Sequence, residues 1–563
     1  MKFSEFKYVR PNIKQIQQQA NEYLEKIGTN YSFNEELTAI NNLSQLMDEV
    51  SSMITIAQIR HDINTKDEFY AEEVNFIDEN IPYISAINNQ LVNKLLESKN
   101  KEQLEKHFGK LLFEQLEVAK KTFKNEIIEK LQIENKLTTE YSKLKAGAKI
   151  EFEGNTYNLT QMAPFMQSTD RNTRKKASLA VSKFYNDNIE KFDEIYDSLV
   201  KVRTEIAKEL GYSNFVQLGY DRLGRTDYNY KDVEKYRNQI ISEVVPYVNE
   251  LTKRKAKRLN IENPQSYDLS LSFLSGNPTP KGDRAWQVEQ AQKMYSEMSK
   301  ETKEFFDFMV EKELLELDSK HNKAGGGYCT YIPKYESPFI YANFNGTAHD
   351  VDVLTHEAGH AFQVYQSRNL IPEYRWPTME AAEIHSMSME FLAWPWIELF
   401  FKEDTPKYKF EHLAGAVSFL PYGALVDHFQ HEVYLNPNLT KEERRKLFRK
   451  LEKQYLPFKK YDEDEFLENG GFWFQQGHIF SSPFYYIDYT LAQVCAFQYW
   501  HNSQKDFKKT WDNYLSLCKL GGSKSFVELI NYVGLKNPFK DNSIKEIIKP
   551  IKEYLNSIDD TKL

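Results

Sequence analysis

Residues 347–365 read TAHDVDVLTHEAGHAFQVY and decide how the rest of the chain is interpreted. Apolar residues recur in this stretch at intervals of three and four, which predicts a helix. Because four residues of helix rise about 6 Å, His356 and His360 would share one face, and both imidazoles could reach a single Zn²⁺ at roughly 2.0–2.1 Å. Glu357 lies beside that face, where it can act on a water molecule as a general base.

Two features of this stretch concern the helix itself. Thr347, followed by Asp350 three residues later, resembles a helix start with a capping residue. Gly359 lies between the histidines although glycine costs a helix about 1 kcal/mol relative to alanine, which indicates that another element packs closely against the backbone there. A bare HExxH pattern also occurs by chance on surface helices, but the helical spacing around it favours a metal site.

A catalytic zinc ion needs three protein ligands and an open coordination position. Three glutamates follow on a second predicted helix and lie near one of its faces, namely Glu380, Glu383 and Glu390. One of them would ligate the metal, and another could accept the N–H of a ligand histidine and so fix its tautomer. Each glutamate could equally be a solvated carboxylate.

A rival group of potential ligands lies at residues 427–432, which read DHFQHE. His428 and His431 could hold a metal as an i, i+3 pair. Because no third ligand and no base accompany them in a coherent pattern, the favoured interpretation is a helix whose polar face pairs with its neighbours.

The order HEAGH, about two dozen residues, and then Glu383-Ile384-His385-Ser386 resembles the thimet oligopeptidase-like zinc metallopeptidases. Residues 220–228 (YDRLGRTDY) and 3–6 (FSEF) resemble the bacterial branch of that family, oligoendopeptidase F and Pz-peptidase. The resemblance implies that Glu383 is the third ligand of one Zn²⁺ per chain. It also implies a mostly α-helical, elongated bundle that is split by a deep cleft, with the HExxH helix at the cleft floor. Short unfolded peptides would be the substrates.

Peptide hydrolysis also needs a donor for the oxyanion, opposite the metal. Candidates lie between residues 477 and 489, where Tyr486 and Tyr489 would share a helix face and His478 precedes a Gly/Ser/Pro-rich stretch. An isolated tyrosine pair would more often belong to the core. The resemblance, however, implies that His478, Tyr486 and Tyr489 contact the substrate carbonyl, with Tyr489 as the main candidate.

The remaining pattern predicts the organisation of the chain. Residues 12–141 are almost free of Gly and Pro and carry amphipathic patterns, which predicts helical hairpins. Residues 149–159 alternate apolar and polar side chains on each side of Gly154-Asn155, which predicts a β-hairpin. This hairpin is the best boundary between a helical domain, 1–160, and a catalytic domain with the substrate cleft, 161–563.

Residues 325–350 predict a small β-sheet near the active site. Segments 328–332 and 338–344 are aromatic, β-prone and punctuated by Gly and Pro, so we expect two or three strands. Segment 338–344 could be an edge strand beside the zinc helix, to which an extended peptide adds through main-chain hydrogen bonds. It could equally be an internal strand.

Composition limits the partners and the compartment. The net charge is −9 without a concentrated basic cluster, so nucleic acid is not an expected partner. No apolar run approaches the roughly 18 residues that a membrane span needs, and no membrane partner is expected. Three widely spaced cysteines are typical of a reducing compartment, so we expect a cytoplasmic protein. Oligomeric state is left open, as are two other functions: a peptide-binding scaffold with a structural zinc, and a zinc amidohydrolase of non-peptide amides.

Overall fold

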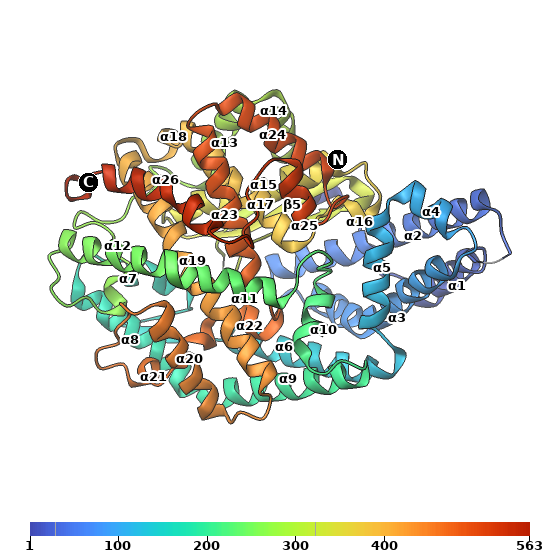
Figure 1. Cartoon of the computed structure of the whole chain (residues 1–563), viewed down its shortest axis with the longest axis horizontal. Coiled ribbons are helices and arrows are strands. Elements are labelled where there is room, and N and C mark those ends of the chain that lie inside the picture. The colour runs from blue at the N-terminus through green and yellow to red at the C-terminus, as the bar shows by residue number, and fades with distance from the viewer. Residues whose placement is uncertain (29, 321) are drawn as a thin grey trace.

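A computed structural model describes residues 1–28, 30–320 and 322–563. The fold is mostly helical with two small sheets, which confirms the fold class expected from the sequence. Figure 1 shows helices of the first 122 residues extending from one side of a larger body. These helices are α1 (Ile13–Leu24), α2 (Phe33–Ile63), α3 (Glu68–Glu97), α4 (Lys101–Phe108) and α5 (Lys110–Thr122). The next helix is α6 (Ile128–Ala146).

A β-hairpin follows α6, as predicted, but its turn lies one residue earlier than expected. Strands β1 (Ile150–Phe152) and β2 (Asn155–Tyr157) are antiparallel, and Asn155 pairs with Phe152. The turn residues are therefore Glu153 and Gly154, with φ of 47° and 81°. A two-residue hairpin loop of this type needs positive φ at both positions, which glycine supplies at the second one.

The second sheet contains three strands in the order β3-β5-β4, which confirms the expected sheet. Its strands are β3 (Leu315–Asp318), β4 (Tyr328–Ile332) and β5 (Ser337–Phe344). The edge-strand interpretation of 338–344 is wrong, because β5 pairs with β3 in parallel on one side and with β4 in antiparallel on the other. The edge strand nearer to the predicted zinc helix is β4, which packs against that helix.

The helices between the two sheets form much of the larger body. These helices are α7 (Ala163–Met166), α8 (Arg171–Asp187), α9 (Ile189–Glu209), α10 (Phe215–Arg222), α11 (Tyr230–Gln239), α12 (Val245–Arg258), α13 (Arg284–Met298) and α14 (Lys300–Glu311). A π-helical turn at Ile240–Val244 joins two of them, α11 and α12.

The helices after the second sheet hold the predicted site. The HExxH helix, α15, packs against β5 and α17, and α17 packs in turn against α23, so these helices lie at the centre of the body. In order, they are α15 (His349–Ser367), α16 (Pro372–Arg375), α17 (Met379–Leu392), α18 (Glu398–Phe401), α19 (Thr405–Leu435), α20 (Lys441–Tyr455), α21 (Glu465–Glu468), α22 (Gly477–Ser481), α23 (Tyr486–Ser503), α24 (Phe507–Leu520), α25 (Phe526–Tyr532) and α26 (Ser543–Ser557).

The start of α15 differs from the expected capping box. The residue at the N-cap is Ala348, and no side chain caps the helix there, so the assignment of Thr347 is wrong. Asp350 instead accepts hydrogen bonds from the backbone N–H groups of Asn345 and Gly346, both at 2.8 Å. Its carboxylate therefore holds the loop before the helix rather than the first helical turn.

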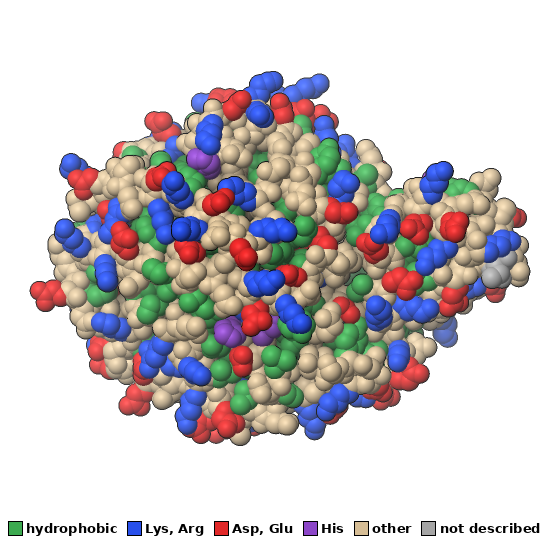
Figure 2. Space-filling model, in the orientation of Figure 1, with side chains coloured by type: hydrophobic (Ala, Val, Ile, Leu, Met, Phe, Trp, Pro, Cys, Tyr) green, Lys and Arg blue, Asp and Glu red, His purple; other side chains and the backbone are tan. Residues whose placement is uncertain are grey.

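The exposed surface mixes charges of both signs. Figure 2 shows Lys and Arg interspersed with Asp and Glu over the visible face, without a continuous basic area on it. In the described parts of the chain, no helix combines the length and the hydrophobicity that a bilayer crossing requires.

Candidate metal centre and active site

Helices α15 and α17 bring together the three predicted ligands. The Nε2 atoms of His356 and His360 lie 3.2 and 3.3 Å from the same oxygen, Oε2 of Glu383. Two ligand atoms at zinc distances and tetrahedral angles are roughly 3.3 Å apart, so these donors are spaced as a zinc site needs. Within the described residues, this is the only cluster of three or more His, Cys, Asp or Glu side chains that could hold a metal.

Gly359 allows the two helices to approach closely enough for this arrangement. A β-carbon at Gly359 would lie 2.6 Å from the main-chain oxygen of His385 and 2.7 Å from the Cα of Ser386. Real β-carbons do not come so near to another backbone. The expected close contact at Gly359 is therefore confirmed, and its partner is the turn of α17 that follows Glu383.

Two hydroxyl groups hold the Glu383 carboxylate in place. Tyr485 donates to its Oε1 at 2.5 Å, and Ser386 donates to its Oε2 at 2.8 Å. Burial alone would raise the pKa of Glu383, but the imidazoles of His360 and His356 outweigh burial and hold that pKa well below its usual range. The carboxylate is thus kept ionised, which is the form that binds a metal. Sequence reasoning missed Tyr485, although its i, i+4 spacing to Tyr489 was visible.

Glu390 is the glutamate that fixes the tautomer of a ligand histidine. Its Oε1 lies 2.7 Å from Nδ1 of His356 and its Oε2 lies 2.8 Å from Nε2 of His412. The indole N–H of Trp394 lies 3.0 Å from the other nitrogen of His412, Nδ1. An indole can only donate, so His412 accepts through Nδ1 and carries its proton on Nε2. Glu390 then accepts from both imidazoles, and Nε2 of His356 keeps its lone pair for a metal.

The other candidate ligands take no part in this centre. Glu380 is buried, and burial raises its pKa while the guanidinium of Arg225 opposes the rise. In the rival segment, Asp427 pairs with Arg237 at 2.5 Å and His431 lies 3.1 Å from the Tyr220 hydroxyl. Residues 427–432 therefore belong to a helix, α19, whose polar side chains pair with neighbouring helices, which confirms the favoured interpretation.

Glu357 lies at the junction of two cavities. It is 8% exposed, and it lines both cavities together with His356 and Tyr489. Each cavity has a volume of about 640 Å³. Burial raises the pKa of Glu357, and the nearby imidazoles only partly offset this. A carboxylate whose pKa is shifted towards neutrality is better suited to accept and return a proton at neutral pH.

The predicted oxyanion donors line the same cavity as Glu357. Gln476 donates from its side-chain amide to Nδ1 of His478 at 2.8 Å, and Nε2 of His478 lies 3.3 Å from the hydroxyl of Tyr489. Burial lowers the pKa of His478 to about 4 and raises that of Tyr489, so both are neutral near pH 7. Tyr486 also lines the cavity, with its ring 5.0 Å from that of His478. The structure places all three side chains near Glu357, whereas their roles stay predictions.

Comparison with known proteins agrees with this arrangement. The model of the Peptidase M3 N-terminal domain matches residues 3–123, and that of Peptidase family M3 matches residues 164–548. An oligoendopeptidase F homolog of Borreliella burgdorferi is 25% identical, over 94% of this chain and 92% of the relative. The solved structure of PZ peptidase A with an inhibitor is 51% identical with a TM-score of 0.97, over 100% of both chains.

A more distant structure shares the fold alone. The oligoendopeptidase-F of Enterococcus faecium is 16% identical with a TM-score of 0.66, and the match covers 98% of this chain and 97% of that one. The resemblance found in the HExxH and Glu383 segments thus extends over the whole chain. The chain belongs to peptidase family M3, in its oligoendopeptidase F and Pz-peptidase branch, and is a metalloendopeptidase.

Proposed function

We propose that this metallo-oligopeptidase uses one Zn²⁺, held by His356, His360 and Glu383, to hydrolyse internal bonds of short unfolded peptides. The observation that carries the proposal is the placement of two imidazole Nε2 atoms at 3.2 and 3.3 Å from a single carboxylate oxygen. The cavities on both sides of this cluster leave room for water and for a peptide on each side of the scissile bond.

Each residue has a separate task in the proposed mechanism. When bound, zinc supplies a Lewis acid that polarises the substrate carbonyl and lowers the pKa of water towards about 7. Glu357 takes the proton of the attacking water and later delivers it to the leaving amine. The hydroxyl of Tyr489 donates a hydrogen bond to the oxyanion that develops on the substrate, and His478 orients that hydroxyl. Tyr486 forms the adjoining wall.

Strand β4 offers a means of holding peptides of varied sequence. Its residues Tyr328, Cys329, Thr330 and Tyr331 line one of the two cavities, and it is one of the two edge strands of the three-stranded sheet. An extended peptide can add to such an edge through main-chain hydrogen bonds, which do not depend on its side chains. The site therefore suits peptides, and neither nucleic acid nor a membrane is proposed as a partner.

The test of this proposal combines metal analysis with peptide cleavage. The protein should contain about one zinc per chain and should cleave a mixed peptide library, and a strong chelator should abolish cleavage until zinc is restored. Glu357→Gln should keep the metal and lose at least about 10²-fold in kcat. Bound zinc without peptide cleavage would favour a scaffold, and turnover restricted to non-peptide amides would favour an amidohydrolase.

A cytoplasmic site of action stays a prediction that rests on cysteine usage. Cys329, Cys495 and Cys518 are all free thiols in the structure. Free thiols persist in reducing compartments.

A further inference from the structure

Four side chains form a row of hydrogen bonds that ends at the catalytic cavity. The hydroxyl of Tyr422 on α19 donates to Oε1 of Gln476 at 2.9 Å, and the amide nitrogen of Gln476 donates to Nδ1 of His478 at 2.8 Å. Nε2 of His478 lies 3.3 Å from the hydroxyl of Tyr489 on α23. The row therefore connects α19 to α23 through the two residues at the start of α22.

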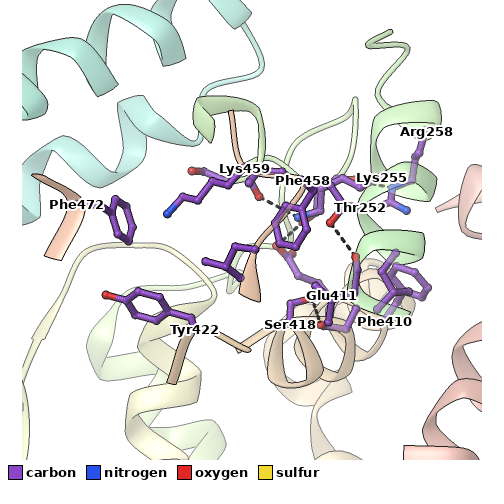
Figure 3. A pocket seen from close by; sticks show the side chains of 18 of the residues that line it. Thr252, Lys255, Arg258, Phe410, Glu411, Ser418, Tyr422, Phe458, Lys459 and Phe472 are labelled. Carbon is purple, nitrogen blue, oxygen red and sulfur yellow. Dashed lines mark hydrogen bonds between the residues drawn. The ribbon is translucent and has the colours of Figure 1, made fainter. Parts of the chain in front are cut away.

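The outer end of this row faces a different cavity from its catalytic end. Tyr422 and Gln476 line a third cavity, of about 540 Å³, whereas the other two members line the cavity that contains the catalytic residues. Figure 3 shows the third cavity, with Tyr422 and Phe472 together on one side of it. The rings of Phe472 and Tyr486 both pack edge-on against Tyr422, each at 5.8 Å. The Tyr422 ring is thus held on two sides, which fixes the position of its hydroxyl.

The tautomer of His478 decides what the hydroxyl of Tyr489 can do. A tyrosine hydroxyl has one proton to donate. If Nε2 of His478 carried no proton, it would accept that one hydrogen bond, and none would be left for the oxyanion of the substrate. If Nε2 carries the ring proton, it donates to the oxygen of Tyr489, and the tyrosine proton can point to the substrate. Only the second tautomer suits an oxyanion donor.

Gln476 selects this second tautomer. Burial lowers the pKa of His478 to about 4, although the carboxylate of Glu383 opposes the shift, so the ring is neutral near pH 7 and has a single N–H. Among the described residues, the amide nitrogen of Gln476 is the hydrogen-bond partner of Nδ1. An amide nitrogen can only donate, so Nδ1 accepts and the ring proton lies on Nε2.

We infer that Gln476, oriented by Tyr422, is a positioning residue for peptide hydrolysis, because it makes His478 a donor and so keeps the proton of Tyr489 free for the oxyanion. The inference rests on the proposed function of Tyr489. Every hydrogen bond in the row then points from the third cavity towards the substrate. Reversing the row would turn the tyrosine proton away from the substrate without moving any side chain.

The test replaces Gln476 with a group of the same shape that cannot donate. In Gln476→Glu a carboxylate would face Nδ1 and hold the ring proton there, so Nε2 would accept from Tyr489. Peptide cleavage is measured at pH 9, so that the new carboxylate does not keep the imidazole doubly protonated. We expect kcat to fall at least about tenfold relative to the wild type at the same pH, within the roughly 10²–10³-fold that an oxyanion donor supplies. KM should change by less than about threefold, because substrate binding does not use this proton.

Two comparison variants separate the direction of the hydrogen bond from the shape of the side chain. Gln476→Ala lets a water molecule donate to Nδ1, so it should lose less kcat than Gln476→Glu. A role in packing alone predicts the reverse order, because glutamate fills the same space as glutamine. Gln475→Glu adds the same charge on the neighbouring residue, which accepts a hydrogen bond from Lys145 only through its main-chain oxygen, and should keep the wild-type kcat.

A double mutant shows whether the effect passes through Tyr489. In a Tyr489→Phe background the hydroxyl is absent, so adding Gln476→Glu should lower kcat by less than about threefold. A variant that merely disturbed the fold would cost as much in this background as in the wild type.

The outcomes separate this inference from the proposed function. Full activity of Tyr489→Phe would refute the proposed role of that hydroxyl. If Tyr489→Phe is impaired, the inference alone is overturned by any of three results: a Gln476→Glu protein within about threefold of the wild-type kcat at pH 9, a smaller loss than in Gln476→Ala, or an undiminished loss in the Tyr489→Phe background.

Discussion

Replacing Gly359 with alanine should weaken zinc binding although it adds a better helix former. Gly359 is in the middle of α15, where alanine would favour the helix by about 1 kcal/mol. Against this, the new methyl carbon would lie 2.6 Å from the main-chain oxygen of His385, whereas ordinary contact begins at 3.4 Å. The two helices must therefore separate by roughly 0.8 Å or distort, because a backbone atom cannot rotate away as a side chain can.

This separation acts directly on the metal site, because its ligands come from both helices. His356 and His360 would stay with α15, while Glu383 would move with α17. A zinc site tolerates errors of only about 0.2 Å in its ligand distances, so a shift several times larger should cost at least about tenfold in affinity. Overpacking of a dense core costs about 1–3 kcal/mol, so the metal-free protein should also lose up to about 2 kcal/mol after the helix gain is subtracted.

Zinc affinity is measured by competition with a chromogenic chelator, and stability by urea unfolding of the metal-free protein. Gly415→Ala is the matched control, because Gly415 is also helical and nothing lies within 4 Å of a β-carbon built there. That control should bind zinc as the wild type does and should be as stable or slightly more stable. A Gly359→Ala protein with wild-type zinc affinity would refute the view that this contact sets the ligand geometry.

Three further predictions concern the surrounding network. Tyr485→Phe should mainly weaken zinc binding, because that hydroxyl holds Glu383, whereas Tyr489→Phe should keep the metal and lower kcat by about 10²-fold; equal effects on both quantities would contradict this division. His412→Ala should weaken zinc binding by about 10–100-fold, and His412→Gln should restore much of it, because a side-chain amide can accept from Trp394 and donate to Glu390. Burial lowers the pKa of His428 to about 4 from 6.5, so only the unfolded chain takes up that proton between these values, and stability falls as the pH drops through this window. His428→Gln should therefore reduce the pH dependence of the free energy of unfolding by up to about 1.4 kcal/mol per pH unit in this window. The check is a plot of melting temperature against pH, which should be shallower for the variant than for the wild type.

The local parts of the site could be predicted because they depend on helical periodicity. The spacing of His356 and His360 places them on one face of any helix, whatever that helix packs against. The glycine between them likewise indicated a close neighbour, because its cost had to be balanced by a contact. What the pattern could not give was the identity of that neighbour, since α17 reaches Gly359 only through the tertiary fold.

The pairing of the strands and the choice between Tyr485 and Tyr486 were harder to predict from the sequence, because they too depend on the tertiary fold. Segment 338–344 was compatible with an edge or an internal strand, and the decision came from β3, whose register with β5 joins Leu315 to Ile340. Tyr485 and Tyr486 both have helical spacing to Tyr489, so periodicity cannot tell which of them faces Glu383. That depends on the rotation of α23 where it docks against α17.

The protonation state of the metal ligand is also set at a distance. Trp394 can only donate a hydrogen bond, so His412 carries its proton on Nε2 and donates it to Glu390. The two imidazoles outweigh burial and lower the pKa of Glu390 to about 2, so this ionised carboxylate can only accept, and Nδ1 of His356 donates to it while Nε2 is left for zinc. The opposite tautomer of His356 would point an N–H towards the metal position and would leave Oε1 of Glu390 without a donor. Because Trp394 is nearly fully buried and packed against Phe391 and Trp500, its indole nitrogen cannot easily turn away. The packing of one apolar side chain in the core therefore contributes to the chemistry of a site that it does not touch.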